Sequence, residues 1–307
     1  STAELEKLIS TSVSNFVGEV VQKGKAFFVA PDVPELMHFT RWLFIPPNAR
    51  SGAKAGDLVQ CHLQRHPFAD GKPSVKVRQS FGPIGTPGLE NDYCAVRAGI
   101  EKMLPKDKFK AIEALVGNGA TVDETREDLR ALPLVSIDSP NTFDIDDALC
   151  AEPQDKGWLL TVAIADPTTC IKEAADLTTL IATRGTSHYF HGLAIPMLPE
   201  ALSQSAALRP QEDKNALVCR LTISADGDVI DSSIKLAIVQ SKAKLNYQEV
   251  EEVLEGGAEH EFAERLQHLN DCFSALRAWR ESRELVIEHR PEHRWLLNEN
   301  KQIDRIE

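Results

Sequence analysis

The chain has 307 residues and a formal net charge of −12, with 42% hydrophobic and 26% charged residues. This length supports two domains with their own cores, and the composition is that of an ordinary globular protein. The acidity argues against a general phosphate-binding surface, and no apolar run approaches membrane-spanning length, so no membrane partner is expected.

Charge is unevenly distributed along the chain, whereas the cysteines are spread over it. Residues 1–90 carry ten Lys and Arg against eight Asp and Glu, whereas residues 131–307 carry seventeen against thirty. Binding of a nucleic acid would therefore depend on local basic stripes. The six cysteines are scattered with no CxxC pair, which excludes a zinc ribbon and favours reduced thiols. The N-terminal residues do not resemble a signal peptide, so we expect a cytoplasmic protein.

The first part of the chain reads as a small β-barrel. Five short β-prone runs alternate with turn residues, a pattern typical of a barrel of the OB or cold-shock type. They are 15–21, 25–30, 41–45, 58–66 and 74–81. Adjacent residues of a strand face opposite sides, so Phe27 or Phe28 is expected to face outward as a platform for stacking bases, with Lys25 beside it. Trp42 lies in an apolar run and is expected in the core.

A helical segment follows the barrel. Residues 95–116 have a helical pattern interrupted by Pro105, and Gly117 ends it. We interpret residues 91–130 as a helical linker without chemistry of its own.

Four aspartates then fall within ten residues: Asp138, Asp144, Asp146 and Asp147. Residues 132–137 read as a buried strand that delivers Asp138 at its end, and a turn-like stretch returns the other three. Carboxylates this close repel unless they share protons, lie in water or hold a cation. Oxygen ligands without nearby His or Cys suit Mg²⁺, or Mn²⁺, rather than zinc.

The segment also admits comparison with three other kinds of acidic site. An EF-hand fails on spacing, because Pro140 and Phe143 stand where an acidic residue and a glycine are required. An aspartyl-phosphate phosphatase, with Asp144 and Asp146 as nucleophile and acid, stays possible and ranks second. A solvated acidic loop is the bland interpretation.

The remainder mixes strands and helices, so the fold class is α+β. Residues 158–165 form an apolar strand, and Asp226-Gly227 marks a hairpin between 217–224 and 229–240. Asn246 with Glu249 resembles a capping box that starts a helix. A longer helix is expected over 259–286, with an apolar stripe for core packing, and a last hairpin over 295–306. The expected stripe consists of Phe262, Leu266, Leu269, Phe273 and Leu276.

Several of these segments together resemble the ribonuclease II family, the RNB-domain exoribonucleases. The aspartate segment TREDLRALPLVSIDSPNTFDIDDALC carries the likeness first. It continues in the family's order through VAIADPT, YFHGLAIPMLPEALS, CRLTISADGDV, SKAKLNYQEV and HRPEHRWLL. The resemblance implies a Mg²⁺-dependent hydrolytic 3′→5′ exoribonuclease that degrades single-stranded RNA to 5′-mononucleotides, with no small-molecule cofactor. It identifies no protein partner.

The resemblance also implies roles for particular residues. Asp138, Asp144 and Asp147 would be metal ligands, and Asp146 a ligand or the group that orients the attacking water. Tyr189 matches the family tyrosine that stacks on the terminal base. In the family an aromatic side chain holds the opposite face of the same base. Ile287 stands at the matching position, so the resemblance does not imply a clamp on both faces of the base.

The expected organisation is an OB or cold-shock-like RNA-binding barrel over 1–90, the linker over 91–130 and the N-terminal part of an RNB catalytic domain over 131–307. Family members continue with a further arginine, more carboxylates and an S1 RNA-binding barrel. An alternative is therefore an RNA-binding or regulatory module that keeps the fold without full activity.

Overall fold

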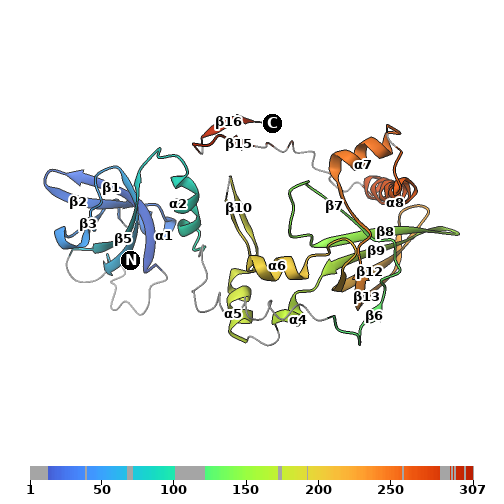
Figure 1. Ribbon diagram of the computed structural model, residues 1–307. Helices are drawn as coiled ribbons and strands as arrows, with labels where there is room; N and C mark the ends of the chain where they lie inside the picture. The colour runs from blue at the N-terminus through green and yellow to red at the C-terminus, as the bar shows by residue number, and fades with distance from the viewer. Residues whose placement is uncertain are drawn as a thin grey trace. The chain divides into compact units, whose positions relative to one another are not determined.

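The computed structural model divides the chain into two compact units (Figure 1). The first comprises residues 1–104, 187–195 and 292–307, and the second comprises residues 105–186 and 196–291. The structure describes residues 13–38, 40–67, 72–100, 122–171, 175–191, 193–257, 259–283, 291, 293, 295–300 and 302–306. None of the described helices is long and apolar enough to cross a membrane.

A closed five-stranded barrel forms the centre of the first unit. Its strands are β1 (Asn15–Lys23), β2 (Ala26–Pro31), β3 (Leu43–Ile45), β4 (Asp57–Arg65) and β5 (Ser74–Pro83), in the order β1-β2-β3-β5-β4. Alternating residues of these strands are fully buried, among them Val17, Val29, Leu43, Val59 and Val75. The strands expected from turn residues and β-propensity are confirmed, and so is the barrel.

One glycine of the barrel is required by close packing. A Cβ added at Gly18 would lie 2.2 Å from the carbonyl oxygen of Ala30 on the neighbouring strand. No side chain fits there without moving the β1–β2 pair, so the glycine permits the close approach of two backbones.

Short elements complete the first unit. The barrel carries α1 (Pro34–Met37), η1 (Pro47–Ala49) and α2 (Leu89–Arg97). Two hairpins belong to the same unit: β10 (His188–Phe190) with β11 (Leu193–Ile195), and β15 (Trp295–Leu297) with β16 (Ile303–Ile306). The final hairpin agrees with the prediction. Helix α2 begins earlier than the predicted 95–116, and residues 101–121 lie outside the described part of the chain.

The second unit is built on a seven-stranded mixed sheet in the order β14-β7-β8-β9-β12-β13-β6. Its strands are β6 (Glu127–Asp128), β7 (Val135–Asp138), β8 (Asp147–Gln154), β9 (Gly157–Ala165), β12 (Asp213–Ser224), β13 (Val229–Gln240) and β14 (Ala243–Asn246). Its helices are α4 (Thr168–Ile171), α5 (Ala175–Arg184), α6 (Glu200–Ala206), α7 (Tyr247–Leu254) and α8 (Ala263–Ser282). The combination of this sheet with the barrel gives the predicted α+β class.

Strand β7 is buried on both faces. Leu134, just before it, belongs to one core cluster with Ala148 and Ala163, while Val135 belongs to a second cluster with Leu266 of α8. A strand covered on both sides needs apolar residues at successive positions. This explains why the predicted strand before Asp138 is mostly apolar, without a strict alternation of apolar and polar residues.

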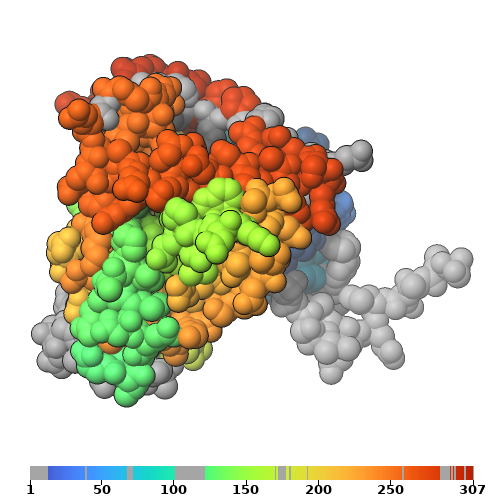
Figure 2. Space-filling view, turned by 90° about the vertical axis from the view of Figure 1, so that its right-hand side faces the viewer, coloured from blue at the N-terminus to red at the C-terminus, as the bar shows by residue number. Residues whose placement is uncertain are grey.

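Helix α8 covers part of the sheet by packing against β8 and β9, and the two lie side by side on the face shown in Figure 2. The predicted Asn246–Glu249 capping box is present and starts α7. The predicted helix over 259–286 is shorter at its start, because His260 and Phe262 form a turn before Ala263. Phe273 is 58% exposed, so this member of the expected core stripe does not pack in the core.

Candidate functional site: the acidic loop and an aromatic surface

The acidic loop joins β7 to β8, and we use this name for residues 138–147. Asp138 is the last residue of β7 and Asp147 the first of β8, so two adjacent strands of one sheet hold the ends of the loop. Asp138 is half-buried, and the other three aspartates are exposed.

The C-terminal part of the loop is anchored by one buried side chain and two backbone hydrogen bonds. Ile145 is 4% exposed and belongs to the main core cluster, and its carbonyl accepts from the Leu208 N–H at 2.9 Å. The next carbonyl, of Asp146, accepts from the Ala165 N–H at 2.8 Å. An apolar residue between two aspartates therefore fixes the backbone from which both carboxylates project.

The N-terminal part is held from a different strand. The Nζ of Lys244 in β14 donates to the carbonyl of Pro140 at 3.0 Å and to that of Thr142 at 2.7 Å. Strand β14 pairs with β7 in parallel, so that Asn246 lies opposite Asp138. The loop also contains a turn, closed by the Thr142 N–H on the Ser139 carbonyl at 3.1 Å.

The four carboxylates act on one another electrostatically. Burial raises the pKa of Asp138, and the charges of Asp147 and Asp144 raise it further, while Lys244 opposes them. Desolvation also raises the pKa of Asp146, and the charges of Asp144, Asp147 and Asp138 add to the rise. A raised pKa from like charges means that the ionised loop stores repulsion, which a bound cation would relieve.

The donor chemistry of the loop fits a hard divalent cation, since all four side chains offer carboxylate oxygens. A metal site also requires that those oxygens lie close to one another. Within the described residues, no three His, Cys, Asp or Glu side chains come together closely enough to hold a metal ion. The structure thus brings the four predicted residues into one electrostatic neighbourhood without forming a closed coordination set.

Asp166 has a structural partner. Its Oδ2 lies 2.7 Å from Nη2 of Arg126, and the two side chains are 8% and 3% exposed. Although burial alone would raise it, hydrogen bonds from Thr168 and Arg126 hold the pKa of Asp166 below its ordinary value. Asp166 therefore forms a buried ion pair directly after β9, next to the residue that hydrogen-bonds to the acidic loop.

An aromatic and basic surface lies on the barrel. Phe28 and Phe44 are opposite each other on β2 and β3, with ring centroids 5.8 Å apart, and Trp42 lies 6.5 Å from Phe28. The Nζ of Lys23 lies 4.6 Å from the Trp42 ring centroid, and the Arg41 guanidinium lies 4.9 Å from it. We call these five residues the aromatic patch.

The two adjacent phenylalanines therefore differ. Phe27 packs against the barrel core, and the Arg50 guanidinium covers its ring at 4.1 Å. Lys25 is exposed in the β1–β2 turn region. Trp42 was expected in the core but is half-buried in the patch. Arg41, which directly precedes Trp42 in the sequence, is the signal that could have indicated a surface position.

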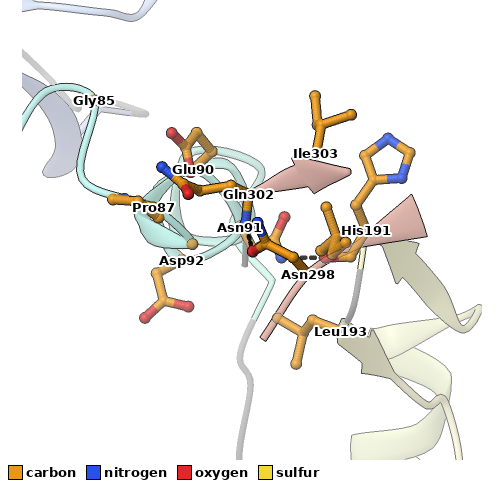
Figure 3. Close-up of a pocket in the computed structure, with 12 residues that line it drawn as sticks. Gly85, Pro87, Glu90, Asn91, Asp92, His191, Leu193, Asn298, Gln302 and Ile303 are labelled. Atoms are coloured by element: carbon orange, nitrogen blue, oxygen red, sulfur yellow. Dashed lines mark hydrogen bonds between the residues drawn. The ribbon is translucent and has the colours of Figure 1, made fainter. Parts of the chain in front are cut away.

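Tyr189 lies on β10 in the first unit and is 74% exposed. The first unit also contains a cavity of about 660 Å³ between α2 and the two hairpins (Figure 3). The Nδ2 of Asn91 donates to the His191 carbonyl at 2.7 Å beside it, and the His191 ring contacts Trp295. None of the predicted site residues lines this cavity. Ile287 lies outside the described residues.

Comparison with known proteins gives the family. The RNB domain model matches residues 126–307, more than half of the chain, and a cold shock domain model matches residues 28–105. The chain belongs to the RNB-domain family. This agrees with the resemblance carried by the aspartate segment and with the cold-shock-like barrel.

Curated relatives of the chain are exoribonucleases. Exoribonuclease 2 of Yersinia enterocolitica serotype O:8 is 34% identical over 321 residues, which cover 98% of this chain and 47% of the relative. Exoribonuclease 2 of Klebsiella pneumoniae is 34% identical over 317 residues, with the same coverage. The chain thus spans about half the length of the curated relatives that it matches.

Solved structures share the fold. Mycoplasma genitalium RNase R, in complex with ribose methylated single-stranded RNA, has a TM-score of 0.80 at 19% identity. The match covers 98% of this chain and 48% of that one. Yeast Ssd1, described as a pseudonuclease, has a TM-score of 0.61 at 15% identity, over 87% of this chain and 34% of that one.

Proposed function

We propose that the chain provides the metal-binding and RNA-binding part of a Mg²⁺-dependent hydrolytic 3′→5′ exoribonuclease that releases 5′-mononucleotides. The observation that carries the proposal is the acidic loop, in which two adjacent strands hold four aspartates within ten residues. Burial and the neighbouring charges raise the pKa of Asp138 and Asp146. Membership of the RNB-domain family, whose curated relatives are exoribonucleases, supports the same conclusion.

Asp138, Asp144 and Asp147 would hold Mg²⁺, or Mn²⁺, and Asp146 would be a further ligand or would orient the attacking water. Such an ion supplies Lewis-acid stabilisation of the charge that develops on the phosphate and the leaving oxygen. The chain itself supplies the placement of the carboxylates. Ile145 fixes the backbone between Asp144 and Asp146, and β7 fixes Asp138.

The aromatic patch is the proposed contact for single-stranded RNA on the barrel. Aromatic rings stack on any base, so this contact tolerates every sequence, and the cations of Lys23 and Arg41 favour the phosphates. Lys25 would extend the basic side of this surface. Of the two adjacent phenylalanines, Phe28 is the better candidate because Phe27 packs against the core and under Arg50.

Tyr189 is proposed to stack on the 3′-terminal base. Its side chain is largely exposed on a short hairpin, which suits a ring that receives a ligand. A cytoplasmic location belongs to the same proposal, because RNA turnover is the expected role.

A second candidate function is an RNA-binding or regulatory module without full activity. The observation that favours it is the absence, among the described residues, of three metal-binding side chains that converge on one point. The fold is compatible with both functions, since RNase R and a pseudonuclease both share it.

One experiment separates these functions. End-labelled single-stranded RNA is incubated with the chain and Mg²⁺, with EDTA as the control, and products are resolved on a denaturing gel. Release of mononucleotides that EDTA stops supports the exoribonuclease, and binding without release supports the module. Hydrolysis of small phosphate esters instead would indicate the aspartyl-phosphate chemistry of Asp144 and Asp146.

The Asp146→Asn variant tests the chemical role of the loop in the same assay. We expect it to fold, to bind RNA and to lose cleavage by about 100-fold or more, the scale for removal of one preorganised polar group. Retained turnover would contradict a chemical role for Asp146.

A further inference from the structure

The two halves of the acidic loop are held in place by different contacts. Four aspartates fall within residues 138–147, and carboxylates this close in the chain repel one another when ionised. Its C-terminal part is anchored by Ile145 and by two backbone hydrogen bonds. The part between Asp138 and Asp144 has no buried side chain, since residues 139–144 are exposed or half-buried.

Lys244 is the support for that weaker part. In the described residues, it is the one side chain that hydrogen-bonds to the backbone of residues 139–144. Two of its three N–H donors are used, one on the carbonyl of Pro140 at 3.0 Å and one on the carbonyl of Thr142 at 2.7 Å. Both residues come shortly before Asp144 in the chain. These bonds join the loop to a strand more than one hundred residues away in the sequence.

The position of Lys244 is itself fixed by the sheet. Lys244 lies opposite Ser136, two residues before the level of Asp138, in the parallel β7–β14 pair. The neighbouring Lys242 N–H donates to the Leu134 carbonyl at 2.7 Å, and Leu245 is buried at 4% exposure. The ammonium group is thus presented from a rigid ladder, and its charge also opposes the repulsion at Asp138.

We propose that Lys244 is a positioning residue of the acidic loop, which ties the Pro140 and Thr142 carbonyls to β14 and so keeps Asp138 and Asp144 placed for a divalent cation. The inference rests on the proposed function as far as the cation is concerned. The tether itself stands on the two hydrogen bonds alone.

The test compares three variants of the chain. Lys244→Met keeps a long apolar stem but removes the donors and the charge, and Lys244→Arg keeps both. Lys242→Met is the matched control, because Lys242 is also half-buried on the same segment but donates to the Arg130 carbonyl and to Gln240 Oε1, away from the loop. Mn²⁺ affinity is measured by calorimetry, and amide hydrogen exchange is followed over residues 139–146.

We expect Lys244→Met to weaken Mn²⁺ binding by about tenfold or more, as for partners that orient metal ligands, and to speed exchange in residues 139–144. Lys244→Arg should stay within about threefold of wild type, and Lys242→Met should change neither quantity. If Lys244 had only a structural role, like Lys242, then Lys244→Met and Lys242→Met would both lower thermal stability, and neither would change the affinity for Mn²⁺.

Two outcomes would overturn the proposal separately from the proposed function. If amide exchange in the loop were equal in Lys244→Met and Lys242→Met, Lys244 would not hold the loop, regardless of the Mn²⁺ affinities. Wild-type Mn²⁺ affinity in Lys244→Met would remove the positioning role. If the wild-type chain bound no Mn²⁺ and cleaved no RNA, the proposed function would fail for this chain and the link to a cation with it, while the exchange measurement would still decide the tether.

Discussion

The buried ion pair between Arg126 and Asp166 gives the sharpest test of how the acidic loop is supported. The pair joins Nη2 and Oδ2 at 2.7 Å, with side chains 3% and 8% exposed. Asp166 follows Ala165, whose N–H donates to the Asp146 carbonyl. We therefore consider Asp166→Asn, a change that keeps the size of the side chain and removes its charge.

The expected cost follows from what the substitution leaves behind. Removing one partner of a buried ion pair costs about 3–5 kcal/mol, because the other charge stays buried without compensation. Here Asp123 Oδ2 remains 3.5 Å from the Arg126 Nε, but its side chain is 38% exposed and compensates only weakly. Asparagine can still accept from Thr168. We expect a loss near the lower end, about 3 kcal/mol of unfolding free energy.

Native-state hydrogen exchange of the β9 amides measures this loss within the second unit, and Asp123→Asn is the matched control, for which a much smaller loss is expected because its ion pair is exposed to solvent. The pKa of Asp166 is held below its ordinary value in the folded state. Its stabilisation is therefore complete above the unfolded pKa, near 4, and is lost as pH falls through the lower folded value. The difference in unfolding free energy between the wild type and Asp166→Asn should therefore be smaller at pH 3 than at pH 7. A loss below 1 kcal/mol at pH 7 would refute the reasoning.

Three further outcomes are expected. Trp42→Ala should weaken binding of single-stranded RNA by about 1–3 kcal/mol in a filter-binding titration while Trp42→Phe keeps most of it, and equal affinity of all three proteins would exclude the stacking role. Gly157→Ala should lower stability by about 1–3 kcal/mol in thermal unfolding, because Gly157 has φ 139° and an added Cβ would lie 2.0 Å from the Ile223 carbonyl oxygen. Ile145→Ala should cost about 2–4 kcal/mol, whereas Phe143→Ala, at a side chain 72% exposed in the same loop, should cost little; similar losses would contradict the anchoring by Ile145.

Local patterns in the sequence were sufficient for most of the fold. The barrel strands follow from short β-prone runs between turn residues, and the capping box at Asn246 is a rule about four consecutive residues. The strand before Asp138 reads as apolar because both of its faces are covered. Each of these signals depends on neighbours in the chain, which a single sequence displays.

The sequence does not reveal features that depend on distant contacts. Trp42 looked like a core residue because its neighbours are apolar, yet its ring meets Phe28, Lys23 and Arg41 on the barrel surface. Tyr189 falls in the middle of the second unit's sequence but belongs to the first unit. Lys244 lies in a motif of the family resemblance without any sign that it holds the acidic loop.

The charge distribution constrains how the proposed nuclease could engage RNA. Residues 131–307 carry thirty acidic against seventeen basic residues, so this part of the chain repels a polyanion. Affinity for RNA must then come mainly from stacking and from the few cations of the barrel, and stacking is far less sensitive to salt than phosphate contacts are. A divalent cation in the acidic loop would reverse the local sign of the charge at the one place where a phosphate has to approach. RNA affinity should therefore rise when Mg²⁺ is added at constant ionic strength in the wild type, and that increase should shrink in Asp146→Asn.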